Sequence, residues 1–285
     1  MSYRSRIAFR FFLCPFICII VYFVIMFFSM QVAALLEGEK YLDHEGMIYL
    51  IEGVIGVSVC IFWWILKKKY VLGTPTIAAG KPIDWTYAVV SALSMLGVAV
   101  LYFYLVKNLH VSAIQKSLED YDEMMDTTSI SKADLYMNVI GTCIFVPILE
   151  EMLFRGFLMQ GMLELKKPLL AIFASALVFG GMHGQPIQIG YAFLAGLMLG
   201  SLYYLTRNLI MTIVAHMIFN IMGNGIYMLF NIPEAADHAL TMIELAAIVA
   251  FAVITVYMAL KRKERFSKVE EETGDINMML PGRHT

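Results

Sequence analysis

The stretch Pro147–Gly156, "PILEEMLFRG", places two adjacent carboxylates and an arginine inside a run of Ile, Leu, Met and Phe. Apolar residues continue on both sides, which predicts a membrane-spanning helix. Glu151 and Arg155 are i, i+4 neighbours on such a helix, so they can pair. Glu150 is rotated by about 100 degrees and lacks that partner. An unpaired intramembrane carboxyl suits a general base; alternatively, the Arg–Glu pair only locks two helices together and Glu150 bonds a neighbouring helix.

The composition is that of an all-α, polytopic membrane protein. Of 285 residues, 60% are hydrophobic and only 15% are charged, whereas a soluble protein of this length needs more polar surface. The net charge of −2 indicates no particular partner, and nothing points to nucleic acid. All four cysteines fall in apolar runs, which indicates neither a disulfide framework nor a metal site.

Eight segments approach the roughly 20 apolar residues of a spanning helix. They lie near 8–35, 47–66, 84–106, 134–163, 168–183, 186–206, 209–231 and 239–260. The fifth is short, so it tilts little, stops within the bilayer, or forms a broken hairpin with the sixth. The first is too long for a signal peptide and is interpreted as a retained span.

Basic and acidic loops alternate along the chain. Lys and Arg gather at the N-terminus, in the second, fourth and sixth loops and in the tail, while the first, third and seventh loops are acidic. Because cytoplasmic loops carry excess Lys and Arg, we expect both termini in the cytoplasm. Short loops and small size are typical of a bacterial protein, so a bacterial cytoplasmic membrane is expected. The third loop, 108–132, is expected to form either an amphipathic surface helix or a solvated acidic loop.

Polar side chains also mark two later spans. His183 follows glycines in "FGGMHG", and His216 shares a helix face with Asn220 and Asn224 in "HMIFNIMGN". A His and an Asn one turn apart can donate to one oxygen, as an oxyanion site requires. The alternatives are a helix-terminal His and an interhelical polar clamp. The stripe Ala192, Gly196 and Gly200 indicates close helix packing.

Together these groups supply what peptide hydrolysis needs: a base to activate water, its partner, and an anion stabiliser. Glu150, His183 and His216 are also a plausible zinc set with water in the open position. Counting about 1.5 Å per residue, Glu150 and His183 lie about 20 Å from the cytoplasmic ends and His216 only about 10 Å. We therefore expect the seventh helix to start deeper or tilt, or the stretch after Arg155 to leave the bilayer.

The order EExxxR, FxxxH, HxxxN resembles the CPBP intramembrane proteases. Here it reads "EEMLFR" from Glu150, "FGGMH" from Phe179 and "HMIFN" from His216. That family comprises the type II CAAX prenyl endopeptidases and the bacterial bacteriocin-processing or Abi proteins. The resemblance covers about residues 134–231, a third of the chain.

The resemblance implies a bundle of about eight helices around an intramembrane cavity that holds a hydrolytic site. It implies that Glu150 activates water with the help of His183. Glu151 and Arg155 would hold the site together or position the substrate.

His216 and Asn220 would bind the oxyanion, or His216 would be a metal ligand. The cofactor implied is Zn²⁺, bound by Glu150, His183 and His216; the same residues also allow water activation without metal. The partners implied are membrane lipid and a membrane-associated peptide or protein, in bacteria a peptide precursor that is matured.

Four regions are expected. Residues 1–133 form three helices and an acidic outer loop, 134–231 the catalytic core, 232–263 the final helix, and 264–285 a polar, disordered cytoplasmic tail. Two other functions stay open: a non-proteolytic immunity or signalling scaffold of the Abi type, and a transporter in which Glu150 carries protons. Against the transporter, the two halves show no repeat of the kind that inverted-repeat carriers often have.

Overall fold

The computed structural model describes residues 9–38, 44–67, 80–126, 130–163 and 165–273, and every regular element there is helical. Parts of the predicted N-terminus and of the first and second loops lie outside these ranges. The elements, with η for π-helices, are η1 (Phe9–Leu13), α2 (Cys14–Glu37), α3 (Glu45–Lys67), α4 (Pro82–Lys107), α5 (Ser112–Met124), α6 (Lys132–Ile140), η3 (Gly141–Phe145), α7 (Val146–Glu151), η4 (Met152–Met159), α8 (Gln160–Leu163), α9 (Pro168–Gly181), α10 (Pro186–Thr206), α11 (Leu209–Asn220), η5 (Ile221–Gly225), α12 (Ile226–Leu229) and α13 (Glu234–Thr273). The predicted all-α membrane bundle is confirmed.

Seven helical stretches in the described ranges are long and apolar enough to cross a membrane. The eighth predicted span is α9, whose 14 residues extend only about 21 Å, less than the roughly 30 Å of a bilayer core. α9 packs along α10 over much of its length. Of the three expectations for this segment, the hairpin with the sixth segment, α10, fits best.

Two other segments are more helical than expected. α13 is continuous to Thr273, so the predicted disorder is wrong for 264–273, and 274–285 lie outside the described residues. In the third loop, α5 confirms the amphipathic alternative. Its Leu118 is buried against Val106 and Ile187, so α5 lies on the bundle.

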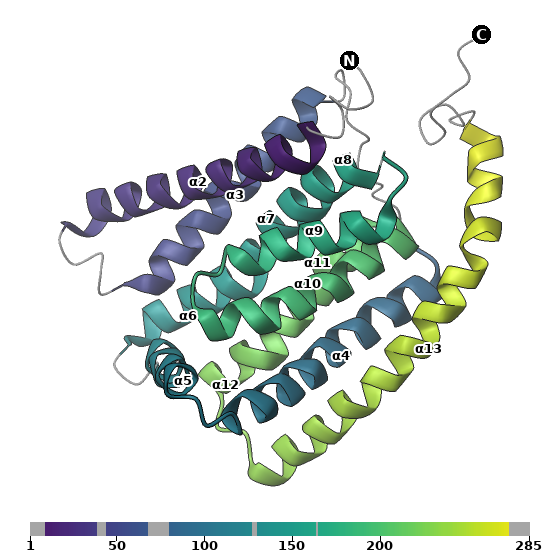
Figure 1. Ribbon diagram of the computed structural model, residues 1–285. Helices are drawn as coiled ribbons and strands as arrows, with labels where there is room; N and C mark the ends of the chain where they lie inside the picture. The colour runs from purple at the N-terminus through teal and green to yellow at the C-terminus, as the bar shows by residue number, and fades with distance from the viewer. Residues whose placement is uncertain (1–8, 39–43, 68–79, 127–129, 164, 274–285) are drawn as a thin grey trace.

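The helices pack as neighbouring pairs around a central set (Figure 1). α2 lies on α3, and α13 lies on α4, while α7, α9, α10 and α11 lie between these pairs. α3 contacts α6, η3 and α7. A Cβ at Gly53 would overlap the Cβ of Phe145, and one at Gly56 would meet Leu149. Glycine at both positions therefore lets α3 approach the backbone of the segment that carries Glu150.

The helix of residues 132–163 is interrupted by two π-helical segments. Ser131 begins it by accepting a hydrogen bond from the backbone N–H of Asp134 at 3.2 Å. Pro147 has no N–H to donate, which favours a widened turn just before it, and η3 occupies that place. Glu150 and Glu151 end the short α7, directly before η4. π-Helical turns often occur at functional sites.

Candidate active site

Glu151 and Arg155 form the ion pair that the sequence predicted. Arg155 Nη1 donates to Glu151 Oε1 at 2.6 Å, and both side chains are fully buried. The second arm, Arg155 Nη2, donates to the carbonyl of Gly196 at 3.1 Å. Gly196 is glycine because α9 passes close by: a Cβ there would lie 3.1 Å from Ala176. The pair therefore ties η4 to α10, across the packing stripe that the sequence indicated.

His216 lies between the two glutamates. Its Nδ1 is 3.0 Å from Glu151 Oε1, and its Nε2 is 3.7 Å from Glu150 Oε2. Because an ionised carboxylate only accepts hydrogen bonds, Nδ1 carries the proton shared with Glu151. In the tautomer that carries its proton on Nδ1, the Nε2 lone pair of His216 faces Glu150.

The helix carrying His216 reaches the same depth as Glu150. α11 begins at Leu209, where the Asn208 Oδ1 atom accepts a hydrogen bond from the Ile210 N–H at 3.0 Å. Counting residues from that end suggested a separation of about 10 Å in depth. Instead, the 3.7 Å contact between His216 and Glu150 brings the two groups together.

His183 lies on the cavity wall in the turn after α9. Its Nδ1 is 2.9 Å from the carbonyl oxygen of Phe179, to which it donates. Within the described ranges, no carboxylate oxygen lies within 4.0 Å of a His183 ring nitrogen. The residue in contact with Glu150 is therefore His216, whereas the sequence had assigned His183 as its partner.

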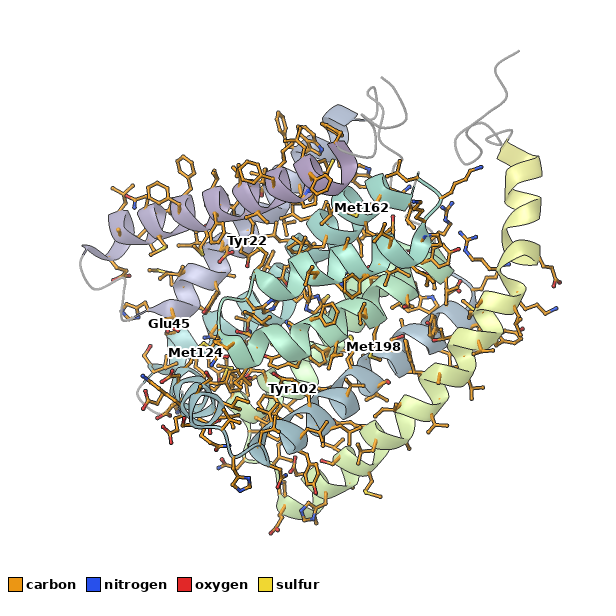
Figure 2. All side chains as sticks on the ribbon, in the orientation of Figure 1. Tyr22, Glu45, Tyr102, Met124, Met162 and Met198 are labelled. Atoms are coloured by element: carbon orange, nitrogen blue, oxygen red, sulfur yellow. The ribbon has the colours of Figure 1, made fainter. Side chains whose placement is uncertain are left out.

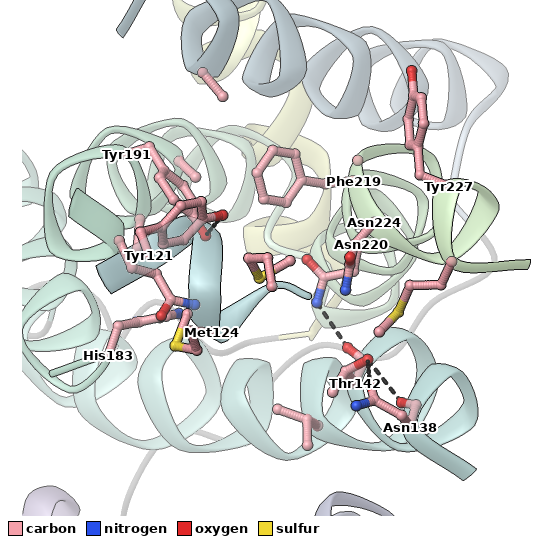
Figure 3. A pocket seen from close by; sticks show the side chains of 18 of the residues that line it. Tyr121, Met124, Asn138, Thr142, His183, Tyr191, Phe219, Asn220, Asn224 and Tyr227 are labelled. Atoms are coloured by element: carbon pink, nitrogen blue, oxygen red, sulfur yellow. Dashed lines mark hydrogen bonds between the residues drawn. The ribbon is translucent and has the colours of Figure 1, made fainter. Parts of the chain in front are cut away.

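Asn220 is fixed by a hydrogen bond across helices. Its Nδ2 donates to the carbonyl oxygen of Thr142, in η3, at 2.8 Å (Figure 3). The polar clamp considered as an alternative is thus present. An amide nitrogen has two hydrogens, so the second N–H of Asn220 is still available to a ligand. Asn224, one turn further, lines the same cavity.

A cavity of about 1220 Å³ joins these groups, with Glu150, His183, His216 and Asn220 on its wall. In Figure 3, His183 lies on one side of the view and Asn220 with Asn224 on the other. Glu151 and Arg155 are not part of the lining; they lie behind Glu150 and His216.

Helices at both ends of the chain also contribute to this cavity, which the sequence reasoning missed. Tyr22 of α2, Glu52 of α3 and Glu244 of α13 all line it. Glu52 is only 3% exposed and Glu244 only 7%. The signal was present, because each is a lone carboxylate within an apolar run, the same anomaly that drew attention to Glu150.

The donors proposed for zinc do not meet in this arrangement. In the described part of the chain, no three His, Cys, Asp or Glu side chains come close enough to hold one metal ion. Nδ1 of His216 is bonded to Glu151, and His183 is not within contact distance of Glu150. The residues as placed thus offer one close carboxylate–imidazole pair, Glu150 and His216.

Comparison with protein families finds a match to "Type II CAAX prenyl endopeptidase Rce1-like" over residues 132–222. No curated protein and no solved structure matches the chain. The matched segment runs from α6 to the start of η5. It contains all the residues of the three motifs quoted above, from Glu150 to Asn220. Residues 132–222, about a third of the chain, are therefore similar to the type II CAAX prenyl endopeptidases, the group that the three motifs also resemble.

Proposed function

We propose that this integral membrane protein is an endopeptidase that hydrolyses a peptide bond in a membrane-associated peptide, such as a bacterial precursor awaiting maturation. The observation that carries the proposal is the pair of Glu150 Oε2 and His216 Nε2, 3.7 Å apart on the wall of one large cavity. The regions outside residues 134–231 would complete that cavity and anchor it in the membrane.

Water activation is assigned to Glu150. A separation of 3.7 Å is too long for a direct hydrogen bond, but one water molecule can contact both groups. Glu150 would take one proton as the water oxygen bonds to the substrate carbonyl carbon. His216 Nε2 would accept a hydrogen bond from the other water hydrogen and so orient the attack. Glu151 supports this by holding the Nδ1 proton, as the carboxylate of a catalytic triad does.

The oxyanion that forms would accept a hydrogen bond from the second N–H of Asn220. The contact to Thr142 holds this amide in place before the substrate arrives, and preorganised donors are the effective ones. When the carbon–nitrogen bond breaks, Glu150 would pass its proton to the leaving amine. His183, whose Nε2 is free to accept, would assist with the proton or contact the substrate from the opposite wall.

We propose that this reaction needs no metal, because the chain's own groups supply the base, the water acceptor and the oxyanion donor. The expected result is that cleavage persists after dialysis against a strong chelator, with metal analysis of the same sample showing less than one zinc per chain. If activity is instead lost with the zinc and returns when zinc is added, Glu150, His183 and His216 would be its ligands after rearrangement, and the protein would be a metalloprotease.

The distribution of charge also favours an orientation. Arg262, near the basic end of the last span, lies over the ring of Tyr204 at 4.1 Å, close to the end of α10. The opposite end of the bundle carries α5 and the acidic start of α13 (Figure 1). Basic ends face the cytoplasm, so both termini would be cytoplasmic and the cavity, lined by Glu123 and Asp126, would open to the outer face.

Cysteine labelling tests this orientation, because all four native cysteines are buried. A membrane-impermeant maleimide should label Asp126→Cys in intact cells. It should label Lys261→Cys only after the cells are permeabilised. The reverse pattern would show that the cavity opens to the cytoplasm.

The proteolytic function itself is tested with purified protein in lipid vesicles and a pool of membrane-associated peptides. Mass spectrometry would identify new N-termini produced by the wild type. Activity that is equally present in the Glu150→Gln variant is contamination, and a pool that yields no Glu150-dependent product contradicts the proposal.

A further inference from the structure

The cavity wall is strongly acidic. Apart from Glu150 and Asp134, which caps α3 by accepting hydrogen bonds from the N–H groups of Gly46 and Met47, six more carboxylates line it. They are Glu45, Glu52, Glu123, Asp126, Asp237 and Glu244. Lys107 is the only Lys or Arg among the lining residues that the structure describes. This excess of negative charge faces one space and comes from α3, from α5 with the residue Asp126 just after it, and from α13.

Glu52 has one carboxylate oxygen for which the described fold supplies no partner. It is 3% exposed, and its Oε1 atom has no hydrogen-bond partner in the described structure. The hydroxyl of Tyr22 lies beside the carboxylate. A buried polar atom left unpaired is destabilising, so such atoms in native proteins usually await a water, an ion or a ligand.

Glu244, on α13, is a second buried carboxylate of the cavity wall without a hydrogen-bond donor in the described structure. It is 7% exposed and makes no hydrogen bond or ion pair within the described residues. Its neighbour Asp237 is already bonded, because it accepts from the Tyr227 hydroxyl at 2.5 Å. Glu52 Oε1 and the Glu244 carboxylate are therefore acceptors on residues of the cavity wall for which the described part of the chain supplies no donor.

Other carboxylates lie where the cavity meets the acidic end of the bundle. Glu45 begins α3, and Glu123 lies beside Met124 near the end of α5; Figure 2 shows Glu45 and Met124 at the same end of the molecule. Glu45, Glu123 and Asp126 are all exposed. An acidic mouth above low-dielectric walls concentrates cations and raises their rate of entry.

Carboxylates accept hydrogen bonds and favour positive charge, so the group that satisfies them carries N–H donors. Lys and Arg side chains fit, because their apolar stems can follow an apolar wall while the charged head reaches an acceptor. Glu52 is close enough to Glu150 for their charges to interact. A side chain that binds Glu52 therefore belongs to a residue near the peptide bond that the water activated by Glu150 attacks.

We propose that the cavity selects substrates with a basic residue next to the cleaved bond, held by Glu52, with a second basic residue favoured at Glu244. The exposed acids at the mouth guide such peptides inward. This substrate class rests on the proposed proteolytic function, but the recognition itself can be measured without turnover.

The test measures binding to the Glu150→Gln protein, immobilised in the nonionic detergent dodecyl maltoside. The probe is a pool of short apolar peptides that carry Lys, Gln or Glu at one varied position, and mass spectrometry gives the enrichment of each. We expect Lys peptides to be enriched about tenfold or more over their Gln counterparts, a factor of ten being a typical gain for one good ion pair.

Adding Glu52→Gln should remove most of this enrichment while leaving the binding of Gln peptides unchanged. Glu119→Gln is the matched control, because Glu119 lies on α5, is exposed and does not line the cavity; it should preserve the enrichment. The proposal is overturned if Lys and Gln peptides bind alike, or if Glu52→Gln weakens both equally.

The outcome is separable from that of the proposed function. Lys peptides that bind selectively but are never cut by the wild type would refute proteolysis and keep the recognition. Peptides that are cut regardless of charge would refute the recognition and keep the proteolysis.

Discussion

Replacing Glu150 with glutamine should abolish cleavage while keeping the fold. Glutamine has the same shape but cannot take a proton from water, and a positioned general base contributes about 10²- to 10⁴-fold. Glu150 is 6% exposed; within the described residues it makes no hydrogen bond, and its contact with His216 is 3.7 Å long. Removing its charge therefore breaks no close pair, and the unfolding temperature should not fall.

The measurement is the rate of product formation in vesicles, with thermal unfolding of the same preparation. Glu119→Gln, the same substitution on the exposed face of α5, should change neither quantity. A Glu150→Gln protein that retains more than about a tenth of the wild-type rate would exclude Glu150 as the base.

In cells the same variant separates the protease from a scaffold. If Glu150→Gln and His216→Ala both restore the phenotype of a deletion strain fully, the cell does not need hydrolysis at the wild-type site. The protein would then act through binding alone, as an immunity or signalling scaffold would.

Replacing Arg155 with alanine should damage both stability and activity. Arg155 is fully buried, bonded to Glu151 at 2.6 Å and to Gly196 at 3.1 Å, and its guanidinium lies 4.6 Å from the centre of the Phe179 ring. Breaking a buried ion pair leaves one charge unpaired and costs about 3–5 kcal/mol. In Arg155→Ala the unpaired charge is Glu151. Because Glu151 also bonds Nδ1 of His216, the substitution should disturb the candidate active site as well.

Thermal unfolding in detergent and the cleavage rate would measure the two effects. The control is Lys261→Ala, which breaks the exposed pair of Lys261 with Glu264 and should shift neither, since exposed pairs contribute little. Arg155→Lys should recover part of the stability, because lysine keeps the charge but not the two-armed contact. If Arg155→Ala unfolds at the wild-type temperature, the pair does not stabilise the fold.

Local rules were enough for several features of the site. The i, i+4 spacing predicted the contact of Glu151 with Arg155, because that distance is set within one helical turn. The small residues of α10 predicted close helix packing, because they lie on one face of the helix and let another backbone approach. Where prediction failed, as for the helical residues 264–273, polar composition was taken for disorder although the chain continues a helix already formed.

The sequence by itself determined the class of the protein, the order of its spans and the polar side chains within them, because hydropathy, helical period and side-chain chemistry are properties of short segments. Only the tertiary structure decided that His216 rather than His183 contacts Glu150. It also showed that Glu52 and Glu244 share their cavity. Contacts of this kind depend on how helices that are distant in sequence shift and tilt when they pack. A π-helical turn or a close contact at a glycine moves a side chain by several ångströms without altering the hydrophobic pattern.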